Sequence, residues 1–133
     1  MSRIRGRDTA PERAVRSALH RAGFRFRLNV EGLPGRPDVV LPRYRTVVFV
    51  HGCFWHRHAG CRNATRPSSN RDFWLAKFAD NVRRDRRNVT ALRKDGWKVL
   101  VVWECEAPAG RSMHRALQTL ERTRAALSSS RSE

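Results

Sequence analysis

The chain has 133 residues, of which 40% are hydrophobic, and this size fits one compact domain with a single core. Lysine and arginine number 28 against 12 aspartates and glutamates, and the resulting net charge of +16 indicates a polyanionic partner. No apolar run approaches the length of a bilayer and the N-terminus lacks the apolar segment of a signal peptide, so we expect a cytoplasmic protein that is not membrane-bound.

The first predicted element is a helix over residues 11 to 22. Thr9 suits the N-cap position, Pro11 falls in the first turn, where a missing N–H costs nothing, and Glu12 fits the third position of a capping box. Apolar residues then recur at helical spacing, at Val15, Ala18, Leu19 and Ala22. Gly23 is expected to end the helix.

Three strands are predicted next. Residues 24 to 31 alternate apolar and polar side chains, which is typical of a half-buried strand. Residues 37 to 41 and 46 to 50 are β-branched and nearly continuous in apolar character, as central strands are, and the turn at residues 42 to 45 predicts a hairpin. We therefore expect these two strands in the middle of a sheet.

The second half of the chain begins with an aperiodic segment, residues 51 to 69, which predicts a long loop. Helical spacing returns from Asn70 to Gly96, a buried strand is predicted at residues 98 to 103, and a last helix at residues 111 to 127.

This order of elements predicts an α/β domain over residues 1–127, with a mixed central sheet flanked by helices. A short N-terminal arm, residues 1–9, precedes it, and residues 128–133 are expected to form a frayed tail.

Cysteines and histidines gather in the long loop and just after the last strand. An odd number of cysteines, in a compartment expected to be reducing, argues against a disulfide framework. Thiolates combined with an imidazole are preferred by tetrahedral zinc. We predict a closed structural zinc site formed by Cys53, His58, Cys61 and Cys105. Alternatively, the cysteines are small buried hydrophobic residues, and their spacing matches no standard zinc finger.

One carboxylate stands at the start of a buried strand. Asp38 is the best candidate in the chain for an acidic Mg²⁺ ligand of a nuclease, although the Pro-Asp dipeptide by itself favours a turn or cap aspartate. His56, which zinc does not require, is a candidate base for an attacking water, or else a solvated loop residue. Glu12 could reach the same site from the first helical turn, although capping alone explains its presence.

Large aromatic side chains stand in or beside the basic loop, at Phe54, Trp55 and Trp74. Such side chains stack on bases or wedge between them. Trp74 is equally explained as a core residue of its helix.

Six sequence blocks follow one another between the N-terminal arm and the last strand: RDTAPE at residues 7 to 12, LPGRPD at 33 to 38, HGCFWH at 51 to 56, FW at 73 and 74, NVRRD at 81 to 85 and VWEC at 102 to 105. Together they resemble the very-short-patch repair (Vsr) endonucleases. That family has a restriction-endonuclease-like fold and cuts one strand of duplex DNA beside a T·G mismatch, so the resemblance implies this fold and this activity.

The resemblance also implies roles for individual residues. Mg²⁺ would be held by Asp38 and the backbone carbonyl of Val50, with His56 activating the water and Glu12 orienting it or a metal-bound water. The family lacks the second carboxylate and the lysine usual in this nuclease fold, and residues 46 to 50 contain neither. Zn²⁺ would be held by the cysteines and histidine already proposed.

DNA contacts follow from the same resemblance. Phe54, Trp55 and Trp74 match the aromatic wedge inserted beside the mismatch. The N-terminal arm is shorter than is common in the family, and its expected DNA-binding residues are Ile4, at the family's apolar position, and the basic residues Arg3, Arg5 and Arg7. The expected partner is mismatched double-stranded DNA, bound by a monomer in the nucleoid alongside other repair proteins.

Two alternatives stay open. The first is an endonuclease with the same active site directed at another sequence, mismatch or modification, because base readout depends on which side chains reach which groove. The second is a non-catalytic, zinc-stabilised DNA-binding module, for which Asp38 and His56 would be dispensable.

Overall fold

The computed structural model describes residues 9–28, 30–53, 58, 61, 69–107 and 109–131. Its elements, in chain order, are α2 (Ala10–Arg21), β1 (Val39–Leu41), the 3₁₀ turn η1 (Pro42–Tyr44), β2 (Thr46–His51), α3 (Arg71–Lys94), β3 (Lys98–Trp103), the 3₁₀ turn η2 (Glu104–Glu106) and α4 (Arg111–Arg131). Within these ranges, none of the helices combines the length and apolar character that spanning a membrane requires.

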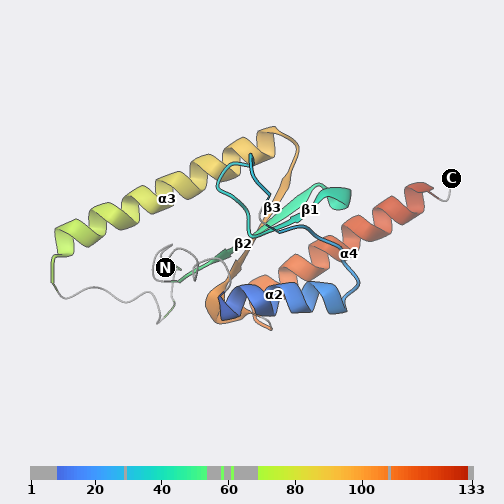
Figure 1. The fold of residues 1–133 in the computed structure, drawn as a ribbon, viewed down its shortest axis with the longest axis horizontal. Coiled ribbons are helices and arrows are strands. Elements are labelled where there is room, and N and C mark those ends of the chain that lie inside the picture. Colours follow the sequence, from blue (N-terminus) through green and yellow to red (C-terminus); the bar gives the residue numbers. More distant parts are fainter. Residues whose placement is uncertain are drawn as a thin grey trace.

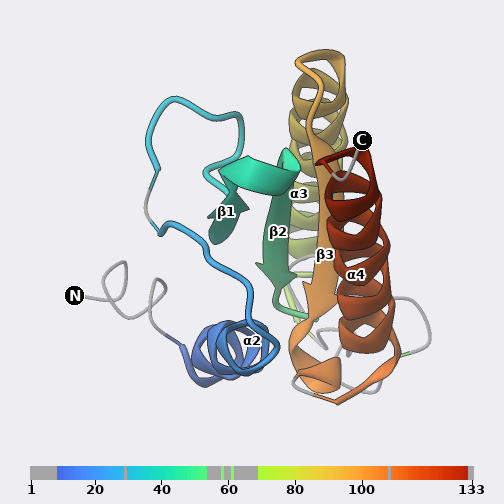
Figure 2. The same cartoon turned by 90° about the vertical axis from the view of Figure 1, so that its right-hand side faces the viewer.

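The sheet is mixed, as the sequence predicts. β1 pairs antiparallel with β2, and β2 pairs parallel with β3, so the order is β1-β2-β3. Figure 2 shows the strands side by side in this order, with α3 behind the sheet and α4 in front of it. Because Thr46 pairs with Lys98 and His51 with Trp103, β2 and β3 run together along their whole length and end at the same edge of the sheet.

Each face of the sheet buries its own apolar cluster, since side chains alternate between the faces along a strand. Towards α2 and α4, residues such as Val48 and Val102 pack against Leu19 and Leu120. Towards α3, the cluster consists of Val40, Val47, Phe49 and Leu92. The molecule therefore has three layers, with α3 on one side of the sheet and α2 and α4 on the other (Figure 1).

The strand predicted at residues 24 to 31 is wrong for the part of it that the structure describes. Only Arg27 pairs there, as an isolated bridge: its N–H and carbonyl exchange hydrogen bonds with Val40 at 2.7 and 2.9 Å. β1 has just three residues, so there is little strand for this segment to pair with. The central position predicted for residues 37 to 41 is therefore also wrong, because β1 lies at the edge of the described sheet and β2 at its centre.

The helices follow the predicted boundaries closely. Thr9 is the N-cap of α2, where its hydroxyl accepts a hydrogen bond from the Glu12 N–H at 3.4 Å, and Gly23 follows the helix with φ +88°. α4, however, is longer than the helix predicted at residues 111 to 127, because it continues through Arg131. Residues 128 to 131 contain neither glycine nor proline, so nothing in the backbone breaks the helix there.

Candidate active site and metal-binding cluster

The position of Asp38 is fixed from both sides. A tight turn precedes it, in which Gly35 has φ +75° and a Cβ at Gly35 would lie 2.8 Å from Nδ2 of Asn88 on α3, so glycine is required there for two reasons. Asp38 then stands immediately before β1, and its Oδ2 accepts a hydrogen bond of 2.6 Å from the N–H of Val50. The carboxylate is thereby held against β2, one residue before that strand ends.

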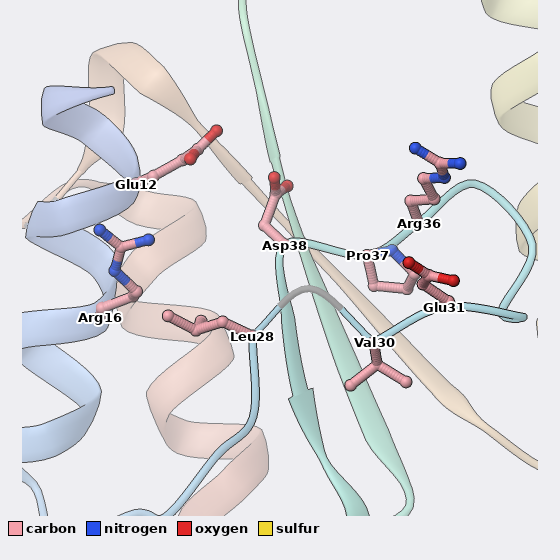
Figure 3. Close-up of a pocket in the computed structure, with 8 residues that line it drawn as sticks. All are labelled: Glu12, Arg16, Leu28, Val30, Glu31, Arg36, Pro37 and Asp38. Atoms are coloured by element: carbon pink, nitrogen blue, oxygen red, sulfur yellow. The ribbon is translucent and has the colours of Figure 1, made fainter. Parts of the chain in front are cut away.

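Glu12 faces Asp38 from the first turn of α2. Glu12 is only 6% exposed, and its side chain points from the helix towards the Asp38 carboxylate (Figure 3). A buried carboxylate beside a second one is unfavourable unless a cation or a proton compensates it. The capping interpretation of Glu12 therefore explains its backbone N–H, but not the placement of its side chain.

The two carboxylates line two adjoining cavities. The first, here called the α2-side cavity, is also lined by Arg16, Leu28, Glu31 and Arg36 (Figure 3). The second, here called the α3-side cavity, is also lined by Val50, His51, Asp85 and Asn88. Glu12, Asp38 and Val50, three of the predicted site residues, are thus brought together.

His51 is a residue of this site that the sequence analysis did not single out. It ends β2, it is 9% exposed, and it lines the α3-side cavity with Asp38. Its ring contacts those of Phe49 and Trp103, at centroid distances of 5.6 and 5.4 Å. The available signal was its place two residues after Phe49, because alternate residues of a strand share a face.

A second group of side chains gathers beyond the ends of β2 and β3. The ligand atoms of Cys53, His58, Cys61 and Cys105 all lie within 4.8 Å of one another. Sγ of Cys105 lies 3.6 Å from Sγ of Cys61 and 3.4 Å from Nδ1 of His58. The N–H of the buried Cys53 donates to the Glu104 carboxylate at 2.9 Å, which ties the end of β2 to η2. This cluster has the composition and size to hold a metal ion.

The electrostatics of the cluster favour a cation. Burial raises the pKa of the Cys53 thiol, while desolvation and hydrogen bonds with Cys53 and Cys61 raise the pKa of Cys105 to about 12. Thiols this close cannot all ionise unless a positive charge lies between them. A bound metal ion would supply that charge and reverse both pKa shifts.

Trp103 connects the cluster to the cavity. The imidazole of His58 stacks on its indole, with centroids 4.3 Å apart and planes 9° apart, and His51 meets the same indole edge-on. Trp103, the last residue of β3, therefore links His58 of the cluster to His51 of the α3-side cavity through ring contacts.

The remaining predicted site residues are placed as follows. Trp74 lies half-buried in the first turn of α3, with its ring 5.4 Å from that of Phe73 and 6.1 Å from that of Phe78. The others fall outside the described residues: Arg3, Ile4, Arg5, Arg7, Phe54, Trp55 and His56.

Comparison with known proteins identifies the family. The family model "DNA mismatch endonuclease Vsr" matches residues 1–62. The type II nicking enzyme V.XorIIP of Xanthomonas oryzae pv. oryzae is 53% identical over 106 residues, covering 80% of this chain and 77% of the relative. V.NmeAIP of Neisseria meningitidis serogroup A is 51% identical, covering 80% and 75%. The DNA mismatch endonuclease Vsr of Escherichia coli K12 is 49% identical over 105 residues, covering 79% and 67%. The chain is a DNA endonuclease and belongs to the Vsr family.

Proposed function

We propose that this endonuclease nicks one strand of duplex DNA next to a T·G mismatch in a Mg²⁺-dependent reaction. The observation that carries the proposal is the convergence of Glu12, Asp38 and the backbone of Val50 on one cavity, in a chain of net charge +16. The relative from Escherichia coli bears the name of a mismatch endonuclease, which supports the choice of target.

The proposed Mg²⁺ ligands are the Asp38 carboxylate and the backbone carbonyl of Val50. The N–H and the carbonyl of a residue in an extended strand point to the same side, and the Val50 N–H is bonded to Asp38. The Val50 carbonyl therefore points to the side on which Asp38 lies. An all-oxygen donor set of this kind suits Mg²⁺, which when bound would polarise the scissile phosphate and a water.

The side chains around this position have separate roles in the proposed reaction. Glu12 accepts a hydrogen bond from the attacking water and orients it, because its carboxylate faces Asp38 across the cavity. His56 takes the proton from that water as the phosphodiester bond is attacked. The cavity histidine His51 adds an imidazole on the α3 side, where it can hydrogen-bond to a phosphate oxygen or a water.

The metal-binding cluster is proposed to hold a structural Zn²⁺. Three sulfurs and one imidazole nitrogen match the donors of closed tetrahedral zinc sites, which leave no position for substrate. Its role is to pin the loop that follows β2, and hence His56, to the end of β3. The fold proposed around both sites is restriction-endonuclease-like, which the mixed sheet with helices on both faces supports.

DNA recognition is proposed to use a set of aromatic and basic side chains. Phe54, Trp55 and Trp74 would wedge between bases next to the mismatch. The arm that precedes α2, residues 1 to 9, would add contacts through Ile4 and its three arginines.

A panel of end-labelled duplexes tests this function. Duplexes that differ in one base pair, T·G against T·A and C·G, are incubated with the parent protein and Mg²⁺, and the products are separated by strand. We expect one strand of the T·G duplex to be cut, with no cut without a divalent cation. Equal cutting of the matched duplexes would overturn mismatch specificity.

A different target is the second candidate. Two relatives that are more than 50% identical are named as nicking enzymes without mention of a mismatch. The panel therefore includes several sequence contexts and methylated cytosines, and cutting that follows context alone would favour this candidate.

A further inference from the structure

Two arginines line the α2-side cavity on opposite sides of Asp38. Arg16 lies on α2 one turn after Glu12, and it is half-buried. Arg36 lies in the turn two residues before Asp38, and it is exposed. In Figure 3, Asp38 stands between the helix that carries Arg16 and the loop that carries Arg36.

Arg36 is held in a costly backbone conformation. Its φ of +48° is in the left-handed region, which a residue with a side chain rarely adopts, and it directly precedes Pro37. A hydrogen bond of 3.1 Å from its N–H to the Leu33 carbonyl closes the turn. Within the part of the chain that the structure describes, no hydrogen bond or ion pair holds its guanidinium, so the head group is available to a ligand.

The carboxylates that line the cavity make cations necessary when DNA binds there. Glu12, Glu31 and Asp38 all line it, and their carboxylates would repel a phosphate brought next to Asp38. A divalent ion at Asp38 offsets part of this repulsion. Arg16 and Arg36 are the only cationic side chains among the described residues that line the cavity, so they are placed to offset part of the remainder.

We propose that Arg16 and Arg36 form a phosphate-binding pair that grips the phosphates on the two sides of the scissile phosphate in the cut strand. This inference rests on the proposed function, since it takes Asp38 as the point of cleavage. A DNA strand carries a phosphate for about every 3.4 Å of helix axis, so a strand centred on Asp38 presents a phosphate towards each side of the cavity. A guanidinium suits this role because its planar fork can donate two hydrogen bonds to one phosphate.

Arg16 and Arg36 differ in one respect. Arg16 has a further interaction within the protein, whereas the Arg36 guanidinium has none among the described residues. A guanidinium has enough N–H donors to keep an internal partner and still bind a phosphate oxygen. Substitution of Arg16 therefore needs a stability control, and substitution of Arg36 provides the cleaner test.

The first experiment measures duplex affinity without divalent cations, over a salt range of about 50 to 200 mM, for the Arg16→Gln, Arg36→Gln and Arg36→Lys proteins. The matched control is Arg122→Gln, which removes one exposed arginine from α4. Each glutamine variant should bind the duplex about tenfold more weakly than the parent. The negative slope of log affinity against log salt should become shallower by about 1. Arg36→Lys should keep the slope, because it keeps the charge. Slopes equal to that of the control would overturn the proposal.

The second experiment locates the contacts. Single neutral methylphosphonates are placed in turn at each phosphate near the nick, and the affinity of each duplex is measured with the parent and with both glutamine variants. Neutralising one particular phosphate should lower the duplex affinity of the parent but not that of Arg36→Gln. Neutralising a phosphate on the other side of the nick should lower the affinity of the parent but not that of Arg16→Gln. If the affinity lost by the arginine substitution and the affinity lost by the neutral phosphate add independently at every phosphate, the assignment of each arginine to one phosphate would be overturned.

The two proposals fail in different ways. A parent protein that binds duplexes but nicks none would overturn the proposed function, and the salt slopes would still decide whether the pair binds phosphates. If Arg16→Gln is unstable in heat denaturation, Arg16→Lys is used in its place. Because lysine keeps the charge, a salt dependence of Arg16→Lys as shallow as that of Arg36→Gln would count against the pair.

Discussion

The hydrogen bond from the Val50 N–H to Asp38 allows the structural role of this carboxylate to be separated from its proposed catalytic role by two substitutions. The bond is 2.6 Å long and its acceptor is Oδ2 of Asp38. Asp38→Asn keeps an acceptor oxygen but loses the negative charge, whereas Asp38→Ala leaves the Val50 N–H without this partner. A hydrogen bond to a charged group contributes about 1.5–3 kcal/mol and a neutral one about 1 kcal/mol.

The two variants should therefore differ in stability. Asp38→Ala is expected to lose about 1.5–3 kcal/mol, which for a chain of this size lowers Tm by about 6–12 °C. Asp38→Asn is expected to lose about 1 kcal/mol less than Asp38→Ala, because its amide oxygen can still accept a neutral hydrogen bond from the Val50 N–H, whereas relief of the repulsion by the buried Glu12 is the same in both variants. Heat denaturation in buffer without Mg²⁺ measures the difference.

Nicking should respond differently from stability. Both variants lose the proposed Mg²⁺ ligand, and the expected loss is about 4 kcal/mol or more in transition-state stabilisation, which corresponds to about a thousandfold in rate. Single-turnover nicking with excess protein measures this, and unchanged metal content of the cysteine cluster serves as the folding control. An Asp38→Asn protein that nicks within about tenfold of the parent rate would refute the ligand role. Equal stability of the two variants would refute the contribution of the Val50 bond.

Three further predictions concern the elements around the site. Cys105→Ser should lower the bound metal per chain and destabilise the protein by several kcal/mol, as elemental analysis and heat denaturation would report; a parent that purifies without metal would contradict this. Glu104→Ala removes the acceptor of the Cys53 N–H and should weaken metal affinity about tenfold in competition with a chromophoric chelator, an effect absent if the carboxylate only faces solvent. Gly35→Ala should cost about 1–3 kcal/mol and slow nicking, because a Cβ there would lie 2.8 Å from a side-chain nitrogen of α3. Gly32→Ala is its matched control, since Gly32 also has positive φ but has open space around it, and equal effects would rule out the contact.

Local signals were sufficient for the helices and for the paired strands β2 and β3. Thr9 and Gly23 mark the ends of α2 through capping and backbone conformation, which depend on neighbouring residues only. The apolar run at residues 98 to 103 predicts β3 at its observed bounds. The same local reasoning failed at residues 24 to 31, because alternation shows that a segment is extended and half-buried but not whether a partner strand is long enough to pair with it.

The contents of the two sites were harder to predict. Asp38 and the cysteines stand out by residue type, so the sequence could name them as candidates. His51 does not stand out by residue type, because its place two residues after Phe49 indicates only a shared strand face and not the cavity beside it. The same is true of Arg16, one of many arginines in a basic chain.

The sequence by itself determined which residue types this protein has available: an aspartate before a buried strand, thiols and imidazoles in number for one metal ion, and a charge suited to DNA. Only the tertiary structure decided which of them meet. Glu12 and Asp38 are 26 positions apart, and Cys53 and Cys105 are 52 apart, and each pair is joined by packing of elements that are remote in the chain. Such contacts depend on the register of β2 with β3 and on the helices that cover the sheet, and no local pattern specifies either one.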